Sequence, residues 1–121
     1  MDSQKFERLV IRAVESLPEE FRQRLDNIDI IIADRPSPEQ MESTDRKRGE
    51  TLLGLYEGVP LTHRHSGYGM VIPDKITIFQ KPIEAACRNN TEIVDEIRRV
   101  VLHEIAHHFG IGDDRLRELG I

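Results

Sequence analysis

The sequence predicts an α+β fold in which helices flank a small β-sheet, with residues 1–121 forming a single domain. Apolar residues recur at helical spacing between residues 6 and 17, and a second helical segment extends over residues 89–109. Three short segments between these helices are predicted to be strands, at residues 28–34, 51–57 and 75–81, and the first of them is rich in β-branched residues. Helices that flank such a group of strands define the α+β class.

The first helix is expected to begin at Asp2 or Ser3, because either side chain can cap its free N–H groups. Pro18 ends this helix and can open a short second helix over residues 19–25. The strand that follows is expected to be buried. Residues 35–50 contain two prolines and a single apolar side chain, so we interpret them as a solvated loop.

The second half of the chain holds the remaining strands and the longest helix. Gly54 lies within the second predicted strand, which indicates a bulge or a close approach of another segment. Residues 82–87 are expected to form a helical turn. Asn90 or Thr91 is expected to cap the long helix, and Gly110 occupies the position of a C-terminal glycine cap. A short helix over residues 115–119 closes the chain.

The long helix carries the pattern H-E-x-x-H. His103 and His107 are four residues apart, so they lie on one helix face, one turn apart, and can ligate one ion. Glu104 lies about a quarter-turn round from His103, beside the ion and any water bound to it. This spacing predicts two nitrogen ligands and a general base. Apolar residues as far as Phe109 predict a buried helix, in which unpartnered histidines would be costly.

A third ligand is expected after the helix. Gly110 lets the chain turn back, and Asp113 follows His107 by six residues. We interpret Asp113 as the third ligand and Asp114 as the cap of the last helix. In the alternative, Asp113 is the cap of the last helix, and the third ligand is either Asp114 or no acidic residue at all. The predicted site is a Zn²⁺ ion held by three protein ligands and a water, whose proton Glu104 would accept.

Other polar residues have weaker assignments. We interpret His108 as structural, hydrogen-bonded in the core, rather than as a ligand. His63 and His65 are interpreted as part of a solvated loop, with a rim contact to substrate as the alternative. Tyr56 and Tyr68 are candidates for an electrophilic helper.

Composition limits the classes of partner. The net charge of −5 disfavours nucleic acid, whose binders usually show a basic excess. The sequence contains no apolar stretch of the length that a membrane span needs, and its N-terminus lacks the apolar core of a signal peptide. Cys87 is the single cysteine, so neither an intramolecular disulfide nor a cysteine zinc site is expected. These features predict a cytoplasmic protein.

The segments "LHEIAHHFGIGDDRL", "LLGLYEGVPLT" and "ITIFQKPI" resemble the small bacterial zincin-like metallopeptidases, a family formerly catalogued as a domain of unknown function. The resemblance implies a minimal zincin fold with a small mixed sheet and an active-site helix. It implies Zn²⁺ on His103, His107 and Asp113, with Glu104 as the base for hydrolysis of a peptide or protein substrate. The chain departs from larger metzincins because no methionine follows Asp113.

Two other classes of function are considered. A metal-dependent RNA-processing hydrolase can use histidines at the same spacing, but it lacks the glutamate beside the first histidine and prefers a basic surface. A non-catalytic binding module stabilised by metal needs neither an aspartate ligand nor a base, because structural zinc sites are usually closed by four Cys or His ligands. Glu104 and the net charge of −5 therefore favour the peptidase.

Overall fold

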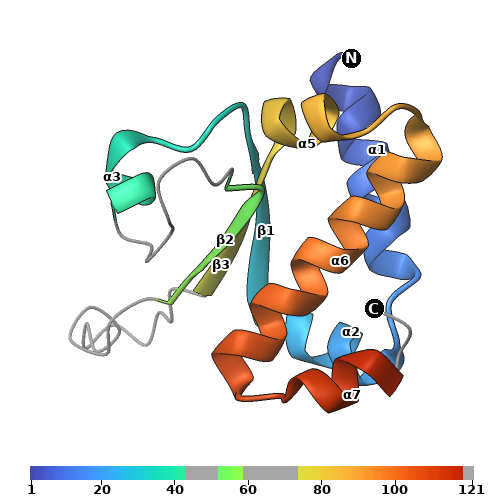
Figure 1. Cartoon of the computed structure of the whole chain (residues 1–121), viewed down its shortest axis with the longest axis vertical. Coiled ribbons are helices and arrows are strands. Elements are labelled where there is room, and N and C mark those ends of the chain that lie inside the picture. The colour runs from blue at the N-terminus through green and yellow to red at the C-terminus, as the bar shows by residue number, and fades with distance from the viewer. Residues whose placement is uncertain (43–51, 59–73, 119–121) are drawn as a thin grey trace.

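The computed structural model describes residues 1–42, 52–58 and 74–118, apart from the side chain of Asp113. It has the predicted α+β fold, with a three-stranded mixed sheet, an N-terminal helix and a long helix near the C-terminus (Figure 1). In chain order the elements are α1 (Ser3–Glu15), α2 (Glu19–Leu25), β1 (Ile28–Ala33), α3 (Pro38–Glu42), β2 (Gly54–Glu57), β3 (Asp74–Phe79), α5 (Gln80–Ala86), α6 (Asn90–Phe109) and α7 (Asp113–Glu118).

Within the residues that the structure describes, the sheet has the strand order β1–β3–β2, which makes β2 an edge strand. The central strand β3 pairs in parallel with β1 and antiparallel with β2. Ile76 of β3 lies between Ile30 of β1 and Tyr56 of β2. Because side chains alternate along a strand, the even-numbered residues of all three strands share one face. That face packs on the helices.

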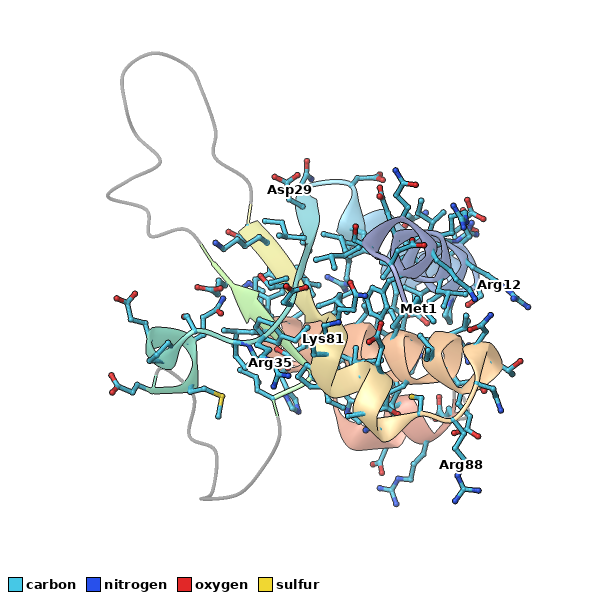
Figure 2. All side chains as sticks on the ribbon, turned by 90° about the horizontal axis from the view of Figure 1, so that it is seen from above. Met1, Arg12, Asp29, Arg35, Lys81 and Arg88 are labelled. Atoms are coloured by element: carbon cyan, nitrogen blue, oxygen red, sulfur yellow. The ribbon has the colours of Figure 1, made fainter. Side chains whose placement is uncertain are left out.

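The core lies between this sheet face and the helices α1 and α6, which run side by side (Figure 1). Phe6 of α1, Ile97 of α6 and Ile78 of β3 are fully buried members of one apolar cluster. Arg12 and Arg88 point away from this core, as the view from above shows (Figure 2). Among the described residues, no helix is both long and apolar enough to cross a membrane.

Both long helices have side-chain caps at their N-termini. Asp2 accepts the N–H of Lys5 at 2.7 Å, so α1 is capped as predicted. The cap of α6 is Asn89, and the expectation of Asn90 or Thr91 is wrong. Asn89 accepts the Glu92 N–H at 2.9 Å, and Glu92 reaches back to the Arg88 N–H at 3.0 Å. The Asn89 side-chain amide also donates to Glu92 Oε2 at 3.4 Å, so the glutamate three residues after the cap favours Asn89 at this position.

The predicted loop over residues 35–50 contains a short helix, α3, and residues 43–50 lie outside the described residues. Ser37 and Gln40 form a capping box, in which each side chain bonds to the main-chain N–H of the other, at 3.1 and 2.9 Å. Pro38 follows the cap at the first helical position. The third strand also ends earlier than predicted, since α5 begins at Gln80.

Candidate metal centre

Two neighbouring stripes of α6 side chains face the edge strand β2. Val100 packs against Gly54, and Glu104 and His108 both contact Tyr56. Arg99, His103 and His107 lie one position earlier along the helix. Residues four apart occupy the same face of a helix, so each stripe is continuous over two turns. The stripe of Val100, Glu104 and His108 therefore holds β2 against α6. The stripe that contains His103 and His107 lies beside this junction.

Gly54 makes the close approach of β2 to α6 possible. A methyl group at Gly54 would lie 2.4 Å from Val100 Cγ1 and 3.3 Å from the Thr77 carbonyl oxygen. Only glycine fits without displacement of its neighbours. Of the two explanations predicted for Gly54, the structure supports the close approach of another segment.

A groove of about 270 Å³ lies between the start of β2 and α6. It brings together three residues of the predicted site with the edge strand, and its lining consists of Leu53, Gly54, Arg99, Val100, His103, Glu104 and His107. Arg99, at one end of this stretch of helix, forms an ion pair with Glu96. The spacing of H-E-x-x-H along α6 and the packing of β2 against this helix together place His103, Glu104 and His107 in the lining of one groove.

The two histidines have a spacing compatible with a shared ion. Their ring centroids are 6.2 Å apart, with the rings inclined by 69°. With Zn–N bonds of about 2.1 Å, two imidazoles on one ion have centroids about 5.2 Å apart in tetrahedral geometry and about 6.4 Å at most. The observed separation falls below this limit, so a side-chain adjustment of about 1 Å gives tetrahedral geometry. His103 is half-buried and His107 is exposed.

Glu104 is anchored through one of its two carboxylate oxygens. Its Oε2 accepts the main-chain N–H of Tyr56 at 3.1 Å, in a half-buried position. Leu53 accepts a hydrogen bond from Phe79 of β3, so the alternation of an antiparallel ladder directs the main-chain groups of Gly54 and Tyr56 away from β3. The bond from Tyr56 to Glu104 follows this direction. Within the described part of the chain, Oε1 has no hydrogen-bond partner.

Tyr56, Asp74 and His108 form a cluster next to Glu104. The Tyr56 hydroxyl donates to Asp74 Oδ2 at 2.6 Å, and the Tyr56 ring stacks on His108 with centroids 3.9 Å apart. The expected place of His108 in the core is wrong, because 39% of its side chain is exposed and its ring packs on Tyr56 instead. Phe109 is also exposed, because both residues lie in the last turn of α6, beyond the buried stripe. Asp74 carried no signal in the sequence.

The predicted third ligand is not placed by the structure. Asp113 is the first residue of α7, and its side chain is outside the described ones. Asp114 is not the helix cap, because α7 begins one residue before it and the Gly112 carbonyl accepts the first helical hydrogen bonds. The Asp114 side chain is 93% exposed and bonds to Arg117. Among the side chains that the structure describes, no group of three or more metal-binding residues is assembled.

The other candidate residues have no demonstrated place in the site. His63, His65 and Tyr68 lie outside the described residues. Cys87 is a free, half-buried thiol. Its pKa is raised by burial and by the negative charges of Glu96 and Glu92, so it lacks the activation of a nucleophilic cysteine.

Comparison with known proteins points in the same direction as the groove. Residues 25–121 match the sequence profile of a family described as zincin-like metallopeptidase. In structure, the chain is similar to a conserved hypothetical protein from Thermo thermophilus, with a TM-score of 0.56 and 23% sequence identity. This likeness covers 90% of the present chain and 94% of the other, and it concerns the fold alone. A comparison with curated proteins finds no match.

Proposed function

The chain belongs to the zincin-like metallopeptidase family, and from this premise we propose that it is a zinc-dependent peptidase that hydrolyses peptide bonds with an activated water. The observation that carries the proposal is the shared groove, in which His103, Glu104 and His107 lie beside an edge strand. Zinc in such a site lowers the pKa of a bound water toward neutrality and polarises a carbonyl group.

We assign the metal to His103, His107 and Asp113. The 6.2 Å separation of the two imidazole rings is compatible with a common ion. Gly110 supports the assignment of Asp113, because its left-handed conformation, with φ of 70°, turns the chain out of α6 only three residues before α7 begins. Three protein ligands leave a fourth position for water, as catalytic zinc sites require.

Glu104 is assigned as the general base. A base must be held in position and still have an atom available for the proton. Glu104 meets both conditions, since Oε2 is bonded to the Tyr56 N–H and Oε1 is without a hydrogen-bond partner in the described part of the chain. Oε1 would accept the proton of the attacking water and then deliver it to the nitrogen of the leaving amine.

The edge strand supports a peptide as the substrate. Gly54 lines the groove, and its main-chain groups point away from β3. An extended peptide can bind such an edge as an additional strand, with main-chain hydrogen bonds that do not depend on its sequence. This arrangement would place a peptide bond next to Glu104, in the groove of about 270 Å³.

The proposal is tested by separating zinc binding from hydrolysis. After loading with zinc sulfate, atomic emission should find about one zinc per wild-type chain and a large loss in His103→Ala. Glu104→Gln should retain the zinc but hydrolyse fluorescein-labelled casein about 10²–10⁴-fold more slowly, because a general base typically contributes that factor. Asp95→Asn makes the same change at an exposed position of α6 and serves as the control. Undiminished hydrolysis in Glu104→Gln would refute the role of Glu104.

A further inference from the structure

Tyr56 is held by three different contacts at the end of the groove. Its main-chain N–H donates to Glu104 Oε2 at 3.1 Å. Its hydroxyl donates to Asp74 Oδ2 at 2.6 Å, in the adjacent strand β3. Its ring stacks on the His108 imidazole with an angle of 18° between the planes. Glu104 and His108 are one turn apart on α6. The helix therefore contacts the main chain of Tyr56 through Glu104 and the ring of Tyr56 through His108.

The partners of the Tyr56 side chain also contact one another. His108 Nε2 lies 3.9 Å from Asp74 Oδ2, the same oxygen that accepts the tyrosine hydroxyl. The Asp74 side chain is only 16% exposed. The region around Gly58 closes the cluster, since a methyl group there would lie 3.7 Å from both His108 Cε1 and Asp74 Oδ1. A rotation of the Tyr56 side chain would therefore break contacts to two elements at once.

We propose that Tyr56 is a positioning residue, whose main-chain N–H fixes the Glu104 carboxylate while Asp74 and His108 fix Tyr56. The inference rests on the proposed role of Glu104 as the base. A glutamate side chain has several rotatable bonds, and a hydrogen bond to a rigid N–H removes most of that freedom before substrate binds. The bond occupies Oε2 and leaves the other oxygen for the proton.

The edge position of Tyr56 gives the inference a test that needs no activity. The Tyr56 N–H points away from β3 and donates to Glu104, so removal of this acceptor should raise its rate of exchange with solvent. The Leu55 N–H faces β3 in the same strand and serves as an internal control. Hydrogen exchange of the metal-free full chain, followed by NMR, should find both amides protected. Glu104→Ala should accelerate exchange at Tyr56 by about tenfold or more and leave Leu55 unchanged.

Changes in the cluster should act on the same amide. His108→Ala removes the stacked ring, and Tyr56→Phe removes the hydroxyl bonded to Asp74. Each should accelerate exchange of the residue 56 amide by about tenfold, with Leu55 again unchanged. His108→Phe keeps a ring for stacking and should stay within about twofold of the wild type. The inference is overturned if the wild-type Tyr56 amide is unprotected, or if Leu55 loses protection to the same extent, since that indicates fraying of β2.

The zinc-loaded chain provides the second measurement. With fluorescein-labelled casein, His108→Ala should lower kcat about tenfold through misplacement of Glu104, while KM and zinc content stay unchanged. An unchanged kcat in His108→Ala contradicts a positioning role, as does a loss explained by raised KM or lost zinc. Absence of hydrolysis in the wild type would refute the proposed function instead, and the amide measurement would then decide the inference by itself.

Discussion

Replacement of Gly54 by alanine tests the junction on which the groove depends. The added methyl carbon would lie 2.4 Å from Val100 Cγ1, whereas carbon atoms in ordinary contact are about 3.5–4.0 Å apart. Val100 cannot easily turn away, because a valine in a helix keeps one strongly preferred rotamer. Strand β2 must therefore move from α6 by about 1 Å or more, which would also lengthen the bond between Tyr56 and Glu104.

The expected cost follows from two opposing terms. Overpacking of a close contact destabilises a protein by about 1–3 kcal/mol. Alanine also restricts the unfolded chain and so stabilises by about 0.4–1 kcal/mol. We expect a net loss of about 1–2 kcal/mol in the free energy of unfolding, or a Tm lower by roughly 4–8 °C in a chain of this size. Urea unfolding followed by circular dichroism measures this loss.

Two further variants separate the clash from other effects of the substitution. Gly58→Ala is the matched control, since its nearest neighbours would be 3.7 Å away and its backbone has no positive φ. Its stability should be unchanged or raised by up to about 1 kcal/mol. Val100→Ala removes the clashing atom, so a double-mutant cycle with Gly54→Ala should show a favourable coupling of about 1 kcal/mol or more. A Gly54→Ala chain as stable as the wild type, with no coupling to Val100→Ala, would refute the close approach of β2 to α6.

Other expected outcomes concern single side chains. Asn89→Ala should lower the free energy of unfolding by about 1 kcal/mol, whereas Asn90→Ala should change it little, because Asn89 provides the cap of α6; equal losses in urea unfolding would contradict this assignment. Asp113→Asn should weaken zinc binding at least about tenfold in chelator competition, and Asp114→Asn should not; the reverse result would make Asp114 the ligand. Cys87 should react with iodoacetamide more slowly than free cysteine near neutral pH, because its raised pKa keeps the thiol protonated there. Alkylation faster than that of free cysteine would contradict this shift. Because the pKa is raised in the folded chain, any stability that the Cys87 thiol contributes is lost as the pH rises through its titration.

Much of the fold could be predicted from local sequence signals. The apolar spacing in residues 6–17 predicted α1, and the glycine at position 110 ended α6 as expected. The expectation that residues 28–34 form a buried strand is wrong, because β1 lies at one side of the sheet, where only Ile28 is buried and Ile31 is 39% exposed. Another error concerns signals that compete within a few residues. Three polar residues at positions 89–91 can each cap a helix, and the choice depends on which one Glu92 can bond. The helix α3 was missed although its capping box can be read in the sequence.

The candidate site was predictable to the extent that it lies on one helix. His103, Glu104 and His107 line one groove because helical periodicity places them on neighbouring faces of α6. Asp113 stays a prediction, since its side chain lies outside the described ones. The contacts of His108 could not be predicted, because its position at the end of α6 is compatible with the core, with solvent or with a neighbouring strand.

The sequence by itself determined which chemical groups α6 carries and how His103, Glu104 and His107 are spaced, because spacing along a helix depends only on backbone geometry within a few turns. Only the tertiary structure decided what faces that chemistry. Tyr56 and Glu104 are separated by 48 residues, and their hydrogen bond exists because β2 is the antiparallel edge strand and Gly54 lets it touch Val100. Such contacts depend on strand order and close packing, which many sequence-distant residues determine together and no local pattern records.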